Sequence, residues 1–138
     1  MPGLRLYKKE KLCSTVAIEQ LFSRSAAVRS TLVYPLRAVW RHNPKRHSDA
    51  SVAFVISVPK KRLRHAVDRV AMRRRIREAY RLCRPAFPMP QIARIDLAFV
   101  FVANDLMPYK NIDRAVNRIM TEVAAYAATI PLDNESGE

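Results

Sequence analysis

The chain has 138 residues, of which 25 are Lys or Arg and 12 are Asp or Glu, so its formal net charge is +13. This length is that of one domain, and a hydrophobic fraction of 49% excludes wholesale disorder. Two cysteines, Cys13 and Cys83, exclude a disulfide framework and are typical of a reducing cytoplasm. The excess positive charge predicts a polyanionic partner.

Three elements are predicted in the first half of the chain. Apolar residues at helical spacing predict a short helix over Thr15 to Arg24. Val33 to Trp40 is predicted as a strand, in which Pro35 indicates an edge position or a local irregularity. This strand would place four residues on one face: Tyr34, Leu36, Ala38 and Trp40. Ser51 to Val58 is apolar at both alternating sets of positions, as expected of a strand covered on both faces.

A basic segment follows. Lys60 to His65 is too charged for a core element and is expected to form a loop or a short edge pairing. Asp68 is expected to cap a helix that runs to about Arg84, where Pro85 prevents its continuation.

The last elements are a strand and a helix. Ile95 to Ala103 predicts an interior strand that is about half the length of a membrane span, so we expect no membrane partner. Asn111 or Asp113 is expected to open a final helix that ends near Ala128. The order α-β-β-(β)-α-β-α predicts an α+β fold in which three helices pack on a small mixed sheet of about four strands. The acidic residues 131–138 are expected to form a solvated tail.

Two-thirds of the excess charge is concentrated in one segment. Residues Lys60 to Arg84 hold eleven Lys or Arg and only two acidic residues, a net charge of +9. On the helix expected there, an apolar stripe would pack on the sheet: Met72, Ile76, Ala79, Tyr80 and Cys83. Arg73, Arg77 and Arg81 stand at i, i+4 and i+8 beside it, and such like charges repel unless phosphates lie between them. We interpret this face as a polyanion-binding surface, and a merely solvated face is the alternative.

No constellation for protein catalysis is evident. The two glycines lie near the termini, so the chain has no glycine-rich phosphate loop. Neither the histidines nor the cysteines have the spacing of metal ligands. The sequence therefore predicts that any chemistry uses reacting groups supplied by a partner.

The segment from Val58 to Leu82 resembles the signature of the bacterial ribonuclease P protein subunit. That signature has a Ser-Lys-Lys-like turn followed by Ala-Val-x-Arg-Asn-Arg-x-Lys-Arg-x-x-Arg-Glu-Ala-Phe-Arg. The matching positions are Lys60, Lys61, Ala66, Val67, Arg69, Arg73, Arg74, Arg77, Glu78, Ala79, Tyr80 and Arg81. Val70 and Ala71 replace the Asn-Arg of the family, and Arg62 or Arg75 would then supply the missing contacts. The resemblance extends over roughly residues 5 to 128.

The resemblance implies a fold, an activity and partners. The fold is the ribosomal protein S5 domain 2-like fold, here a single RNA-binding domain over residues 1–138 with a left-handed crossover. In this ribonucleoprotein endonuclease, the catalytic RNA subunit and its Mg²⁺ ions remove the 5′ leader of precursor tRNA. The protein subunit binds the RNA subunit and the leader, and no obligate protein partner is implied.

The resemblance also implies two sets of site residues and no catalytic or metal-binding residue in the chain. The set that binds the RNA subunit is Lys60, Lys61, Arg62, Arg69, Arg73, Arg74, Arg77 and Arg81. The set that binds the leader, in a cleft between the first helix and a sheet face, is Phe22, Tyr34 and Arg37. Leu36 competes with Tyr34 for one family position, and Ile18 stands where many members have a second aromatic residue.

Two other functions fit a basic chain. A general RNA-binding protein or chaperone without a dedicated holoenzyme would bind unrelated polyanions with similar affinity. A basic amphipathic module for anionic membranes would need an apolar face, but the core uses the apolar stripe of the arginine helix.

Overall fold

The computed structural model describes residues 12, 15–23, 28–43, 51–87 and 94–129, and the structural statements below concern these residues. Their elements are α1 (Thr15–Leu21), β1 (Arg29–Val33), β2 (Leu36–His42), β3 (Val52–Ser57), α2 (Ala66–Cys83), the 3₁₀ turn η3 (Arg84–Ala86), β4 (Ile95–Phe101) and α3 (Tyr109–Ala127). This order confirms the predicted α+β fold. The predicted acidic tail, residues 131–138, lies outside the described residues.

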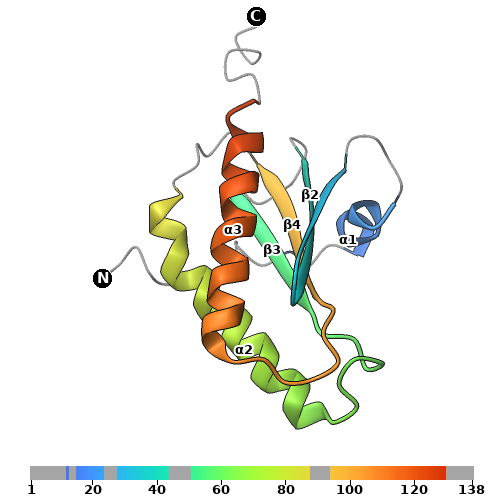
Figure 1. The fold of residues 1–138 in the computed structure, drawn as a ribbon. Helices are drawn as coiled ribbons and strands as arrows, with labels where there is room; N and C mark the ends of the chain where they lie inside the picture. The colour runs from blue at the N-terminus through green and yellow to red at the C-terminus, as the bar shows by residue number, and fades with distance from the viewer. Residues whose placement is uncertain (1–11, 13–14, 24–27, 44–50, 88–93, 130–138) are drawn as a thin grey trace, which may run out of the picture.

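The four strands form one mixed sheet in the order β1-β2-β4-β3. β2 is antiparallel to both β1 and β4, whereas β3 and β4 are parallel. Parallel neighbours need a crossover connection, and α2 lies in the one that joins β3 to β4. Figure 1 shows the consequence: α2 and α3 cover one face of the sheet, and the short α1 lies on the other face.

The main core fills the space between the sheet and the two long helices. Leu36, Leu97 and Phe99 are fully buried there because alternate strand residues point toward the helices. The residues that α2 buries are those of the predicted stripe: Met72, Ile76, Ala79, Tyr80 and Cys83. The residues that α3 buries are Ile112, Ala115, Val116, Ile119, Met120, Val123 and Ala127. Hydrophobic periodicity therefore identified the buried face of α2 correctly.

A smaller cluster holds α1 on the opposite face. It consists of Leu12, Ala17, Leu21, Val39, Ala53 and Ala98. Since α1 has only seven residues, it covers one end of this face, and no other helix of the described ranges covers the rest of it.

The predicted strand Val33 to Trp40 is wrong in one respect, because the chain turns within it. Tyr34 and Pro35 form the turn of the hairpin between β1 and β2. Proline has no N–H to donate to a strand ladder, and its fixed φ suits a turn. Tyr34 consequently does not share the buried face with Leu36: Tyr34 is 65% exposed, and Leu36 is fully buried.

Several helix boundaries also differ from the predicted ones. α2 begins at Ala66 with His65 as its N-cap, so Asp68 lies in the first turn. Its negative charge interacts favourably there with the positive end of the helix dipole. The preceding segment forms a loop with a turn and no strand pairing. α3 begins at Tyr109, before the predicted openings at Asn111 or Asp113. α1 ends at Leu21, and its predicted end at residue 24 lies outside the described residues.

Candidate nucleic-acid interface

A cleft lies on the part of the sheet that α1 does not cover. The strand register places Leu32, Arg37 and Val100 side by side in one row across this face. The next row contains Val39 and Ala98, which pack in the α1 cluster and are buried. Arg37 in the first row is exposed and Val100 is half-buried. The uncovered row therefore forms the floor of the cleft.

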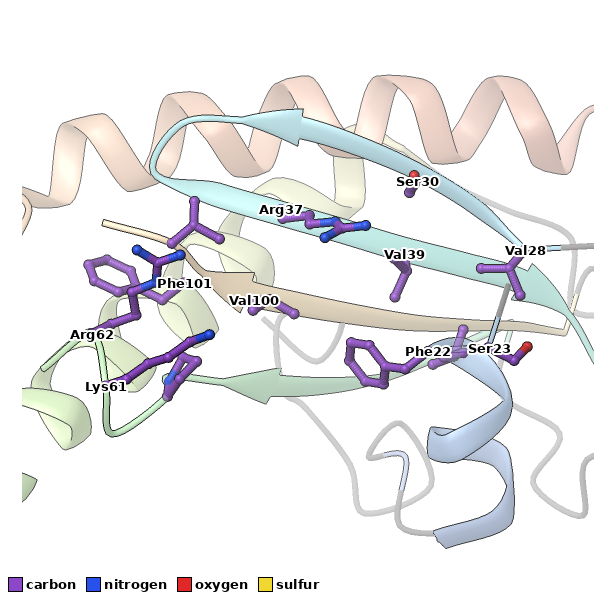
Figure 2. Close-up of a pocket in the computed structure, with 13 residues that line it drawn as sticks. Phe22, Ser23, Val28, Ser30, Arg37, Val39, Lys61, Arg62, Val100 and Phe101 are labelled. Atoms are coloured by element: carbon purple, nitrogen blue, oxygen red, sulfur yellow. The ribbon is translucent and has the colours of Figure 1, made fainter. Parts of the chain in front are cut away.

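The cleft has a volume of about 520 Å³, which is within the range of small ligand sites. Phe22, directly after α1, forms one wall and is 52% exposed. Lys61 and Arg62, in the turn after β3, form the opposite wall, and Arg37 lies between the two walls (Figure 2). An exposed aromatic ring and three cations thus border one surface. This combination is typical of sites for single-stranded nucleic acid, in which bases stack on aromatic rings and phosphates pair with cations.

A second cavity, of about 600 Å³, continues this surface around the hairpin tip. Tyr34 lines it, and both Arg37 and Arg62 line the two cavities in common. The structure therefore places Phe22, Tyr34 and Arg37 along one surface, although Phe22 follows α1 and the other two belong to the β1–β2 hairpin. Of the two competing residues, Tyr34 is at this surface and Leu36 is buried on the opposite face.

A separate basic surface lies along α2. Val70, Arg73, Arg74 and Arg77 line a groove between this helix and β3. Their spacing of i, i+3, i+4 and i+7 puts them on one face of the helix. The three arginines are exposed, and none has an acidic partner within the described part of the chain. Their guanidinium groups are therefore available to phosphates.

Comparison with known proteins assigns the chain to a family. The family model described as "Ribonuclease P" matches residues 6–124, most of the chain. The chain belongs to the ribonuclease P protein family. A ribonuclease P protein component of Porphyromonas gingivalis strain W83 is 33% identical over 137 residues, which cover 97% of each chain. The same component of strain ATCC 33277 is 33% identical over 133 residues, or 94% of each chain.

This assignment confirms the resemblance that the α2 signature carries. Ribonuclease P is a ribonucleoprotein endoribonuclease of tRNA processing, and this chain is its protein subunit. In the structure the matching signature spans the turn after β3 and most of α2.

Arg75 and Arg81 of the ribonuclease P signature region are both engaged by other protein groups. Arg81 Nε and Nη2 donate to the two carboxylate oxygens of Glu78, at 3.0 and 2.6 Å. These hydrogen bonds lower the pKa of Glu78, so a phosphate would compete with that carboxylate for Arg81. Arg75 Nη1 donates to the carbonyl of Met107 at 2.5 Å and ties α2 to the segment before α3. No pattern in the sequence indicates this last contact, because its partners are 32 residues apart.

Lys60, Lys61 and Arg62 lie together in the turn that begins the ribonuclease P signature. The structure places Lys61 and Arg62 at the wall of the cleft opposite Phe22, and Lys60 is exposed in the same turn. Arg62 Nη1 donates to Asn104 Oδ1 at 3.2 Å, which holds the guanidinium at the cleft wall. Sequence reasoning missed Asn104, since only the fold brings it to Arg62.

Arg69 closes the loop that leads into α2. Its Nη1 donates to the carbonyl oxygens of Leu63 and Arg64, both at 2.9 Å. We expect Arg69→Ala to lower the free energy of unfolding by about 1 kcal/mol, because two carbonyls lose a charged donor. Urea unfolding would measure this loss, with Arg74→Ala as the control, since Arg74 is exposed on the same helix. Equal stabilities of the two variants would contradict a structural role for Arg69.

The chain's donor groups do not fit a metal centre in the described ranges. No three His, Cys, Asp or Glu side chains gather there in a way that could hold a metal ion. Cys83 is a core residue, and burial raises the pKa of its thiol to about 12. Asp96 is fully buried in β4, where it accepts a hydrogen bond from Asn43 Nδ2 at 2.7 Å. No α-helix in the same ranges is long and apolar enough to cross a membrane.

Proposed function

We propose that this ribonuclease P subunit binds two RNA partners with two different surfaces. The arginine face of α2 binds the catalytic RNA subunit, and the cleft beside α1 binds the 5′ leader of precursor tRNA. The observation that carries the proposal is the separation of the two basic surfaces. One lies at the outer edge of the sheet, along α2 and β3, and the other lies on the open sheet face. One chain can therefore contact both RNAs at once.

The cleft has the chemistry of a site for a short single strand. A leader base would stack on the exposed ring of Phe22, which contributes about 1–3 kcal/mol for each stacked base. Arg37, Lys61 and Arg62 would pair with the phosphates on either side of that base. Tyr34 would contact the strand where it leaves the cleft around the hairpin. Stacking and phosphate contacts depend little on base identity, so the site suits leaders of varied sequence.

Docking of the RNA subunit would depend on the unpaired arginines of α2. Arg73, Arg74 and Arg77 project from one helix face, and each planar fork can contact a phosphate with two parallel hydrogen bonds. Lys61 and Arg62 of the predicted set line the cleft instead. We place Arg69 and Arg81 at the margin of the α2 surface, because both already bond to protein groups. Lys60 is exposed in the turn before α2.

The reacting groups and the Mg²⁺ ions would belong to the RNA subunit. The chain itself would bind and orient the two RNAs and neutralise part of their phosphate charge. Its cations would offset the repulsion between leader phosphates and RNA-subunit phosphates, which reduces the Mg²⁺ concentration that binding requires. A cytoplasmic location, without a membrane or an obligate protein partner, accords with this role.

Binding specificity separates this proposal from a general RNA-binding protein. We expect the purified chain to bind the RNA subunit at least about tenfold more tightly than a structured RNA of equal length at the same salt concentration. The salt dependence cannot discriminate, because about five phosphate contacts on single strands give a log–log slope near −3.5 in either case. Equal affinities for the two RNAs would contradict the proposal and favour a chaperone without a dedicated holoenzyme.

A further inference from the structure

Arg62 lies where the two cavities of the proposed leader surface meet. It lines the cleft of about 520 Å³ that Phe22 borders (Figure 2), and it also lines the cavity of about 600 Å³ at the hairpin tip. Arg37 is the other cation that lines both cavities. A strand that runs from the cleft around the hairpin would therefore pass the Arg62 side chain. The position of this guanidinium group consequently matters for both parts of the surface.

Backbone hydrogen bonds hold together the segments around Arg62. The N–H groups of Arg62 and Leu63 donate to the carbonyl of Pro59, at 3.0 and 3.3 Å, and close the turn after β3. The N–H of Val102, directly after β4, donates to the carbonyl of Pro35 at 2.9 Å and joins that segment to the hairpin tip. The Arg62 side chain therefore extends from a closed turn into a region whose other walls are also held in place.

The hydrogen bond to Asn104 restrains the Arg62 side chain itself. Arg62 Nη1 donates to Asn104 Oδ1 at 3.2 Å, and Asn104 lies shortly after β4, which ends at Phe101. Both residues line a third cavity, of about 530 Å³. Asn104 lines neither of the two leader cavities, whereas Arg62 lines both. An effect of Asn104 on a leader in those cavities would therefore pass through Arg62.

The amide of Asn104 is a neutral acceptor, which has two consequences for Arg62. A free arginine side chain loses rotamer entropy when it binds a phosphate, and a protein group that already holds the side chain reduces this loss. A guanidinium group has several N–H donors, so the bond from Nη1 leaves others for phosphate oxygens. Because the amide oxygen carries no net charge, Arg62 also keeps its full positive charge.

Arg81 shows the effect of a charged partner in the same protein. Its Nε and Nη2 donate to both carboxylate oxygens of Glu78, at 3.0 and 2.6 Å, so a phosphate would have to displace that carboxylate. An aspartate at position 104 would offer the same acceptor atom as Asn104, but its charge would compete with phosphate for Arg62. The amide is thus the group that positions an arginine and leaves its charge available to an anion.

We infer that Asn104 is a positioning residue for leader binding. It holds Arg62 at the meeting point of the two cavities, where the guanidinium group pairs with a leader phosphate. The inference rests on the proposed function of the cleft and adds a residue outside the cleft on which leader recognition depends.

The test measures the dissociation constants of precursor tRNA and mature tRNA for the reconstituted holoenzyme over a range of salt concentrations. We expect Asn104→Ala to weaken precursor binding about two- to tenfold, with an unchanged salt slope and unchanged binding of mature tRNA, because only the restraint on Arg62 is lost. Asn104→Asp should also weaken precursor binding, but it should reduce the salt slope by about 0.7, the value of one phosphate contact on a single strand. Leu106→Ala is the control, because Leu106 is 47% exposed and lines the third cavity but neither leader cavity. Equal salt slopes for the two Asn104 variants would overturn the inference.

A double-mutant cycle with Arg62→Ala shows whether Asn104 acts through Arg62. Arg62→Ala alone should weaken precursor binding, and Asn104→Ala should have no further effect in that background. Additive losses would overturn the positioning role and leave the leader cleft in place. The same holds if Arg62→Ala weakens precursor binding and Asn104→Ala alone does not. Wild-type binding of both RNAs by Arg62→Ala would instead remove Arg62 from the proposed leader site, and the inference with it.

Discussion

Replacement of Arg73 and Arg77 together by glutamate is expected to abolish assembly with the RNA subunit and to leave the fold intact. The two side chains lie one helical turn apart on the exposed face of α2. The substitutions remove two phosphate contacts and place carboxylates where phosphates would lie, and like charges in contact cost several kcal/mol. We expect affinity to fall by at least about 100-fold at constant salt, measured by filter binding or by electrophoretic mobility.

The matched control is the pair Arg114→Glu and Arg118→Glu. These two arginines are also exposed and one turn apart, but they lie on α3. Their substitution by glutamate changes the net charge by the same amount as that of Arg73 and Arg77. Far-UV circular dichroism and urea unfolding should show that both double variants keep the fold, because all four side chains are exposed and surface substitutions change stability little. Normal assembly of the α2 variant would show that α2 is not the docking face.

Phe22→Ala is expected to weaken the binding of leader-containing precursor tRNA to the holoenzyme much more than the binding of mature tRNA. Phe22 is half-exposed at the wall of the cleft, so the substitution mainly removes the ring surface on which a leader base would stack. The loss of one stacked base is about 1–3 kcal/mol, or roughly 5- to 150-fold in the dissociation constant. Equilibrium binding of both RNAs to the reconstituted holoenzyme would measure the difference.

Val16→Ala is the control for Phe22→Ala. Val16 is 62% exposed on α1, the helix that Phe22 directly follows, and does not line the cleft. Its substitution should leave the preference for leader-containing RNA unchanged. A Phe22→Ala variant that loses affinity for precursor and mature tRNA equally would exclude Phe22 from leader recognition.

Sequence patterns were sufficient for the elements that have a strong hydrophobic period. The stripe on α2 was predicted residue by residue, because burial against the sheet requires apolar residues at helical spacing. The apolar run around Ser51 to Val58 likewise predicted β3, which is buried on both faces at its start. Such patterns reflect local burial, which a sequence records directly.

There is a physical reason why the sequence did not predict the hairpin between β1 and β2. Its strands are short and its apolar residues continue across Tyr34 and Pro35, so the period alone indicates one strand. The turn can be inferred only if Pro35 is taken to mark a reversal of the chain direction. With that reversal, Tyr34 moves from the expected core face to the open surface.

The resemblance implied two sets of site residues, but the sequence did not indicate that Lys61 and Arg62 line the same cleft as Phe22. Charge counting found the arginines of α2, and it grouped Lys61 and Arg62 with them. The register of three strands, together with the short length of α1, places these two residues in the cleft with Phe22. Contacts such as Arg62 with Asn104 join residues 42 positions apart, and no periodic pattern reports them.

We propose that this chain supports the activity of a catalytic RNA by binding both that RNA and the leader. The most direct measurement is single-turnover cleavage of precursor tRNA by the RNA subunit at a low Mg²⁺ concentration, with and without the chain. We expect the chain to increase the cleavage rate, and we expect the Arg73→Glu, Arg77→Glu variant to lose this effect. An RNA subunit that is active at high Mg²⁺ but gains nothing from the wild-type chain at low Mg²⁺ would contradict the claim.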